Sequence, residues 1–235
     1  MIRTRLEVIK FLAQVCTDDY LDSMTSYKHS IGAHQEYSVK NSQATALWDM
    51  RYNTFINYSA TFEVVYAIIR RGGLWTAIAV YDPRTKELFL VFKEKNLKEI
   101  MKQKSNSHYL LILNTINDKL KAHAGGEQLN LFDNDSPDAM KLENYRKQLH
   151  DVIAGIGIMP DTVIVFGFES NYEKRFKAYI FNSNQELVYQ KDYSDLIESD
   201  FTRIPFDDGV QPTIFNEERS SSHSIKPSIR IKGLK

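Results

Sequence analysis

Residues 62–92, FEVVYAIIRRGGLWTAIAVYDPRTKELFLVF, decide the fold of this chain. Three runs rich in β-branched and aromatic residues lie in or beside this stretch, at about 62–70, 74–81 and 87–93. Each run has the length and composition of a strand. Gly72-Gly73 separates the first two runs, and Asp82-Pro83-Arg84-Thr85 separates the second from the third; both are typical turn sequences. The stretch therefore predicts a three-stranded meander.

A second stretch, residues 162–197, has the same character. Its three apolar runs lie at about 162–169, 175–181 and 186–191. Apolar residues at helical spacing surround both stretches and predict helices at 2–15, 44–59, 96–104, 107–121 and 138–154, with a short helix near Tyr193. Between the first two helices, residues 17–43 are predicted to be irregular. The repeated order of helix, three-stranded meander and helix predicts an α+β protein with mainly antiparallel sheet.

These patterns divide the chain into four parts. They are an N-terminal α+β half (1–121), a linker (122–137), a C-terminal α+β half (138–198) and an extended or disordered tail (199–235). The two halves share matched residues when they are aligned, such as Ala77 with Ala178. An internal duplication explains these matches. The general likeness of any two meanders followed by helices explains them as well.

The predicted helix at 44–59 carries a face that is expected to be buried. Leu47, Trp48, Phe55 and Ile56 form this face.

Composition limits the classes of protein to which this chain can belong. Thirty basic and thirty acidic residues among 235 give a formal net charge of zero, which argues against a broadly basic nucleic-acid-binding body. The single cysteine, Cys16, excludes an intrachain disulfide and suits a reducing compartment. Apolar stretches such as 152–159 are too short to cross a bilayer. We therefore expect a cytoplasmic protein without a membrane partner.

The linker contains one apolar peptide, Gln-Leu-Asn-Leu-Phe at residues 128–132. Gly125-Gly126 precedes it, and the polar residues 133–137 follow it, so its surroundings are those of a flexible, solvated segment. Three large apolar side chains in such a segment favour a peptide that binds a partner. The alternative is a clip, in which the same side chains pin the linker to the core of the protein itself.

The peptide Gln128, Leu129, Asn130, Leu131 and Phe132 resembles the motif by which many bacterial replication and repair proteins bind the β sliding clamp. The third residue of that motif is usually Ser or Asp, and Asn130 keeps a small polar side chain there. The resemblance implies that Gln128 forms a hydrogen bond at the rim of a clamp cleft. It also implies that Leu131 and Phe132 fill the apolar floor of the cleft, with Leu129 packed alongside. Five residues carry the resemblance, and they say nothing of the fold.

Several longer segments carry a second resemblance. They are ALWDMRYNTF (46–55), GGLWTAIAVYD (72–82), ELFLVFKEK (87–95) and HYLLILN (108–114), together with QLNLF (128–132). In these segments the body of the chain resembles an uncharacterised domain family of bacteria and their phages. No function is attached to that family, so this resemblance indicates which kind of organism the protein comes from and not what the protein does.

Basic residues in three places are candidates for contact with DNA phosphates. They are Arg70 and Arg71 at the tip of the first predicted hairpin, Lys93, Lys95 and Lys98 after the third strand, and Lys226, Arg230 and Lys232 in the tail. Glu94 and Glu99 lie among the lysines, so a solvated face is the favoured interpretation there. For the tail, a solvated chain end is likewise favoured over nucleic-acid contact.

The sequence contains no recognisable catalytic motif, cofactor motif or metal motif. The six histidines lack the spacing of metal ligands, and the Asp/Glu-x-Lys triplet of restriction-like nucleases does not occur. We therefore expect a non-enzymatic accessory protein of bacterial or phage DNA replication or repair, which docks on the host sliding clamp and needs no cofactor. Two alternatives stay open: a nucleic-acid-processing enzyme with a dispersed site, and an interaction module of a mobile element or of phage–host conflict.

Overall fold

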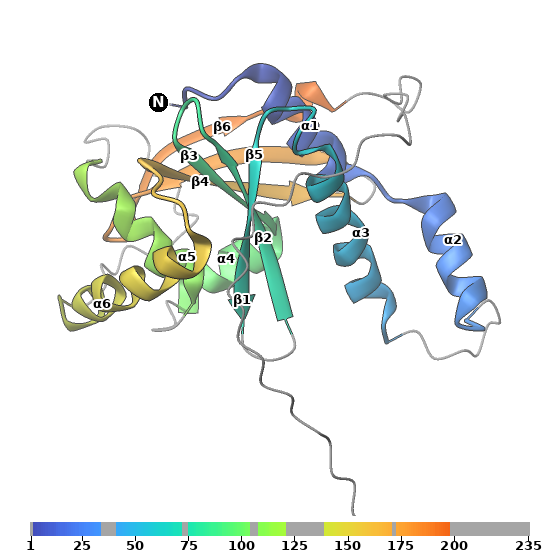
Figure 1. Cartoon of the computed structure of the whole chain (residues 1–235), viewed down its shortest axis with the longest axis horizontal. Helices are drawn as coiled ribbons and strands as arrows, with labels where there is room; N and C mark the ends of the chain where they lie inside the picture. Colours follow the sequence, from blue (N-terminus) through green and yellow to red (C-terminus); the bar gives the residue numbers. More distant parts are fainter. Residues whose placement is uncertain are drawn as a thin grey trace, which may run out of the picture.

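Six strands form one sheet in the order β1-β2-β3-β4-β5-β6. The structure is a computed structural model that describes residues 2–33, 41–71, 75–103, 108–120, 139–170 and 173–197. The strands are β1 Val65–Arg71, β2 Trp75–Asp82, β3 Glu87–Lys93, β4 Thr162–Glu169, β5 Arg175–Phe181 and β6 Leu187–Asp192. All neighbouring strands are antiparallel except β3 and β4, which are parallel. Two antiparallel meanders are thus joined through one parallel pair (Figure 1).

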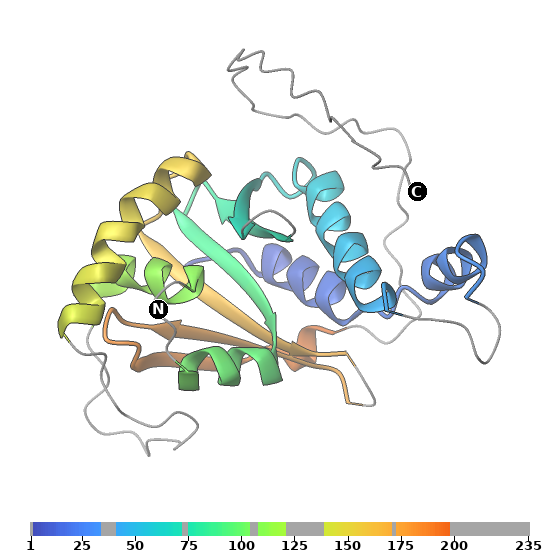
Figure 2. The same cartoon turned by 90° about the horizontal axis from the view of Figure 1, so that it is seen from below.

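Helices cover both faces of the sheet (Figure 2). The helices are α1 Leu6–Thr17, α2 Leu21–Ser30, α3 Gln43–Tyr58, α4 Glu94–Gln103, α5 Tyr109–Leu113 and α6 Ala139–Ile156, with 3-10 helices η1 Asn114–Lys119 and η2 Ser194–Leu196. α1 and α3 pack against one face, and α4, α5 and α6 pack against the other. α2 lies beside α3 and away from the sheet, and none of its residues is buried. None of the helices in the described ranges is both long enough and apolar enough to cross a membrane.

The central strands β3 and β4 are buried on both faces, which explains why their sequences are apolar along most of their length. In β3 every residue except Lys93 is buried, and in β4 every residue is buried except the first and the last. Alternate side chains enter opposite cores, so that Phe89 packs toward α1 and α3, whereas Leu88 and Leu90 pack toward α4 and α5. Two parallel strands can be joined only by a long crossover. Because helices cover both faces of the sheet, neither face of these strands meets solvent, and polar side chains do not alternate with apolar ones along them.

Asn117, a buried residue of η1, fixes the crossover to the sheet. Its Nδ2 donates hydrogen bonds to the carbonyl oxygens of Val163 at 2.9 Å and Phe181 at 2.8 Å. Its Oδ1 accepts a hydrogen bond from the backbone N of Val163 at 2.9 Å. One amide side chain therefore satisfies three buried backbone groups on β4 and β5.

Two buried acids at the β2–β3 turn hold the N-terminal residues in place. Asp82 and Glu87 are fully buried, which is rare for carboxylates unless they have partners. Glu87 accepts a hydrogen bond from the backbone N of Arg3 at 2.9 Å, and Asp82 lies 3.5 Å from the Nε of Arg5. Arg5 also donates to the carbonyl oxygen of Phe62 at 2.5 Å, and so connects the acids to the chain just before β1.

The α+β class and both predicted meanders are confirmed, and three local predictions are wrong. Residues predicted to be irregular contain α2, whose lack of buried residues leaves no apolar stripe in the sequence. The single helix predicted at 107–121 is α5 followed by η1, with non-helical backbone angles at Asn117. On the predicted face of α3 only Phe55 is buried, and Leu47, Trp48 and Ile56 are half-buried. The cation Arg51 is fully buried. The turn residues Gly72-Gly73 lie outside the described residues.

Replacing Asn117 with leucine tests whether this side chain pins the crossover. We expect Asn117→Leu to lower the free energy of unfolding by about 3 kcal/mol, because three buried backbone groups lose their partner at roughly 1–3 kcal/mol each. Asn53→Leu, at an exposed position of α3, is the control and should change this energy by less than about 0.5 kcal/mol. Urea denaturation measures both; equal losses would contradict a special role for Asn117.

Candidate functional site

The clamp-like peptide Gln128–Phe132 lies outside the described residues, within the crossover from β3 to β4. The description stops at Leu120, after η1, and resumes at Ala139, the first residue of α6. Basic residues Lys226, Arg230 and Lys232 of the predicted tail also lie outside it. The place of the peptide in the chain therefore follows from the topology, whereas its exposure stays a prediction.

A pocket of about 370 Å³ contains residues from both sides of this undescribed segment. Its lining is Asp118, Leu120, Leu142, Arg146, Asn182, Ser183, Asn184 and Glu186. Most of these side chains are polar, and several bond to one another: the Ser183 hydroxyl donates to Asp118 at 2.8 Å, and Asn182 donates to Glu186 at 2.7 Å. Arg146 lies 3.5 Å from Asp118. This polar lining suits water or a polar group better than the Leu and Phe side chains of the peptide.

The predicted basic residues near the sheet occupy two places. Arg70 and Arg71 form the end of β1, where their backbones pair with Thr76 and Trp75; their side chains lie outside the described residues. Lys93 ends β3, and α4 begins at the next residue. Lys93 is thus the last residue of β3, and Lys95 and Lys98 follow in the first two turns of α4.

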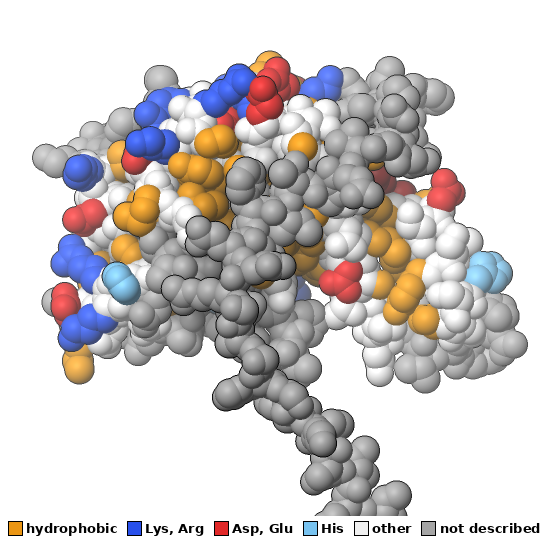
Figure 3. Space-filling view, viewed as in Figure 1, with side chains coloured by type: hydrophobic (Ala, Val, Ile, Leu, Met, Phe, Trp, Pro, Cys, Tyr) orange, Lys and Arg blue, Asp and Glu red, His pale blue; other side chains and the backbone are white. Residues whose placement is uncertain are grey.

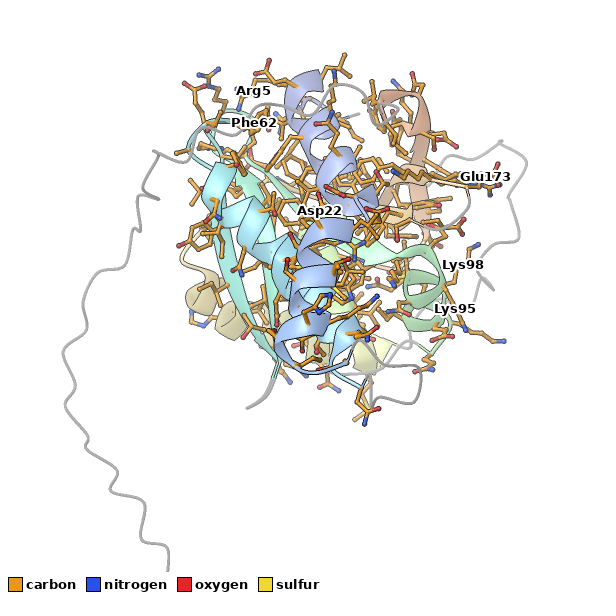
Figure 4. All side chains as sticks on the ribbon, turned by 90° about the vertical axis from the view of Figure 1, so that its right-hand side faces the viewer. Arg5, Asp22, Phe62, Lys95, Lys98 and Glu173 are labelled. Carbon is orange, nitrogen blue, oxygen red and sulfur yellow. The ribbon has the colours of Figure 1, made fainter. Side chains whose placement is uncertain are left out.

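Lys95 and Lys98 project outward from α4 (Figure 4). Glu173, between β4 and β5, lies on the same side of the molecule in this view and pairs with Arg175. Figure 3 shows basic and acidic side chains interspersed on another face, without one large patch of a single sign. The described lysines therefore form a small local group, as the net charge of zero suggests.

Glu94, the first residue of α4, turns inward instead of joining the exposed lysines. Its carboxylate accepts a hydrogen bond from the Tyr179 hydroxyl at 2.8 Å and lies 3.6 Å from the Nζ of Lys98. Burial, followed by this hydrogen bond and the negative charge of Glu94, raises the pKa of Tyr179. Glu94 lies over Gly167 of β4, where an added Cβ would collide with its Oε2. The carboxylate thus neutralises part of the charge of Lys98 and leaves Lys93 and Lys95 without an ion pair among the described residues.

Arg51 on α3 is the residue of this region that sequence reasoning missed. Its side chain is fully buried, with Nε donating to the carbonyl oxygen of Cys16 at 3.1 Å and Nη2 donating to that of Asp18 at 3.2 Å. These carbonyls end α1, where the helix carries partial negative charge. The guanidinium carbon lies 5.6 Å from the ring centroid of Trp48 and 5.0 Å from that of Phe168, within the range of cation–π attraction.

Burial lowers the pKa of Arg51 and raises that of the adjacent thiol, Cys16, to about 12. Cys16 is therefore protonated at neutral pH and poorly suited to nucleophilic chemistry. The only sign in the sequence that Arg51 is buried is its position on the same helical face as the apolar residues Trp48 and Phe55. The described residues contain no group of three His, Cys, Asp or Glu side chains placed to bind a metal ion.

Residues 8–234 match the model of a family of unknown function, DUF5986. The chain belongs to this family. No curated protein and no solved structure gives a significant match. Membership in DUF5986 agrees with the resemblance of the body to an uncharacterised domain family. It assigns no activity, ligand or partner, so any functional argument has to start from the residues themselves.

The close approach of Glu94 to Gly167 can be tested by a double-mutant cycle. We expect Gly167→Ala to lower the free energy of unfolding by about 1–3 kcal/mol, because the new methyl group overpacks the contact. Adding Glu94→Ala removes the colliding oxygen and should recover part of this loss; Tyr179, whose Cε2 lies 3.0 Å from the added Cβ, limits the recovery. If the losses of the two single variants simply add, the contact has been wrongly described.

Proposed function

We propose that this member of DUF5986 is a non-enzymatic accessory protein of bacterial or phage DNA replication or repair. It docks on the host β sliding clamp through the peptide Gln128–Phe132. The observation that carries the proposal is the peptide itself: three large apolar side chains behind a leading glutamine, in a segment that is otherwise polar and glycine-flanked.

The topology of the fold supports a role for this segment outside the core. Residues 121–138 belong to the crossover between β3 and β4, and crossovers tolerate long insertions without disturbing the strands that they join. The described pocket that adjoins both ends of the segment has a polar lining, which gives Leu129, Leu131 and Phe132 little reason to pack there. These features favour a docking peptide over an internal clip.

The energetics predict a weak tether. Three apolar side chains buried in the cleft of a partner contribute roughly 1.5–3 kcal/mol each. Ordering five flexible residues costs on the order of 1–2 kcal/mol per residue. The remainder is small, so the peptide alone binds its partner only weakly. Such a peptide recruits the protein to the clamp, and a second contact is needed to hold it there.

Lys93, Lys95 and Lys98 are our candidates for this second contact. Lys95 and Lys98 point outward from α4, and Lys93 is exposed at the end of β3. Contacts of these lysines with the DNA backbone would add a weak, salt-dependent attraction that is independent of base sequence. Once the peptide is bound to the clamp, the lysines would be held at a high effective concentration near the DNA, so that each contact would strengthen the other.

The paired substitution Leu131→Ala with Phe132→Ala tests the docking peptide. We expect wild-type protein to bind purified bacterial sliding clamp, and the paired variant to bind it at least roughly a hundredfold more weakly. Asp133→Ala with Asn134→Ala, in the same segment but outside the motif, is the matched control and should bind like wild type. Isothermal titration calorimetry measures all three proteins.

Equal clamp binding by wild type and the Leu131/Phe132 variant would contradict the proposal. The same variants separate docking from the internal clip. A docking peptide leaves the free energy of unfolding within about 0.5 kcal/mol of wild type, whereas a clip would lose about 2–5 kcal/mol.

A further inference from the structure

Arg51 has hydrogen-bonding capacity that the described part of the protein does not use. Its Nε and Nη2 donate to backbone carbonyls, and Nη2 also lies 3.5 Å from the hydroxyl oxygen of Ser170. Its Nη1 is buried and has no hydrogen-bond partner among the described residues. A buried donor without an acceptor costs about 1–3 kcal/mol, and more when it is charged, so such an atom calls for an explanation.

The charge of Arg51 is also not matched by an ion pair. Within the described ranges, no carboxylate lies within salt-bridge distance of its guanidinium. The carboxylate of Asp18 is near enough to influence Arg51, but its Oδ1 accepts a hydrogen bond from the backbone N of Tyr20 at 2.9 Å. Backbone carbonyls and aromatic rings attract the cation but carry no net charge.

A second cation lies close to the first. Burial and the positive charge of Arg51 lower the pKa of Lys93. Lys93 pairs in the sheet with Phe168, and the ring of Phe168 contacts the Arg51 guanidinium. Two like charges near the same aromatic residue repel each other, and an anion bound by both would convert this repulsion into attraction.

The position of these residues in the fold matches a general rule for ligand sites. Lys93 ends β3 and Ser170 follows the last residue of β4, so both lie at the carboxyl ends of the parallel pair. In open parallel α/β sheets, ligands bind outside the carboxyl ends of the strands, and β3 and β4 form the one parallel pair of this sheet. Arg51 is buried, Ser170 is half-buried and Lys93 is exposed, so the three side chains extend from the interior to the surface.

We propose that Arg51, Lys93 and Ser170 form a binding site for a phosphate group at the carboxyl ends of β3 and β4. The guanidinium offers the two N–H groups of Nη1, the serine hydroxyl offers another donor, and the lysine supplies the second positive charge. A tetrahedral dianion accepts several hydrogen bonds at once and matches two cations. The site does not depend on docking of the clamp. A free phosphate and the backbone of a nucleic acid are both sources of this group.

Inorganic phosphate is the first probe, added to the full-length protein at constant ionic strength with chloride as the reference. We expect phosphate to raise the thermal unfolding midpoint in a saturable manner, because a ligand that binds only the folded state stabilises it. Lys93→Ala should weaken phosphate binding about tenfold, the effect of one charge-assisted contact. Lys102→Ala removes another exposed lysine, near the end of α4, and should bind phosphate like wild type. Lys93→Arg should retain most of the affinity.

Arg51→Lys tests the buried end of the site, and Ser170→Ala provides a milder change if the Arg51 variant does not fold. Both should weaken phosphate binding, and the backbone amide resonances of residues 168–170 should shift when phosphate is added to wild type. A single-stranded oligonucleotide without terminal phosphates distinguishes the sources. If it competes with phosphate, the site accepts a backbone phosphodiester; if it does not, the site takes a free phosphate or a phosphomonoester.

Two results would overturn the proposal. One is a phosphate titration that stabilises the protein no more than chloride does at the same ionic strength. The other is equal weakening of phosphate binding by Lys93→Ala and Lys102→Ala, which would mean unspecific attraction to surface charge.

Discussion

The parallel contact between β3 and β4 makes one protein out of two meanders. The strands pair from Glu87 opposite Thr162 to Lys93 opposite Phe168. A parallel neighbour cannot be reached through a tight turn, so the chain crosses over through α4, α5, η1 and α6, and these helices cover one face of the sheet. With α1 and α3 on the other face, both strands are buried except at their ends. The long crossover and the polar strand ends follow from this one pairing.

The same pairing separates two chemical environments at the strand ends. On the α4 face, Glu94 lies over Gly167 and accepts a hydrogen bond from Tyr179. On the α1 and α3 face, Arg51 lies against Phe168 without an ion pair among the described residues, and the exposed Lys93 is close by. At these strand ends the carboxylate of Glu94 thus has bonding partners, whereas the cations Arg51 and Lys93 have no acidic partner among the described residues. The second environment suits an anion, and the crossover on the opposite side carries the peptide for which we propose clamp docking.

The sequence predicts the strands well because each has an apolar run bounded by turn residues, and this local signal does not depend on the rest of the chain. It does not predict that β3 and β4 pair, because register between distant strands leaves no mark in either of them. It misses α2, which buries nothing, and it misses Arg51, because an arginine on an amphipathic helix ordinarily faces solvent. The lysines that the sequence singles out lie at the carboxyl end of β3 and in α4, whereas the clamp-like peptide, Gln128–Phe132, lies outside the described residues.

Native-state hydrogen exchange tests most directly whether the parallel pair unites the fold. If it does, the amides of β3 and β4 are the slowest to exchange, and the slowest amides of both meanders share one free energy of opening, equal to that of global unfolding. If the amides of β1–β3 and those of β4–β6 instead open with two clearly different free energies, the halves unfold independently. The parallel pair would then be a contact between two units and not the centre of one.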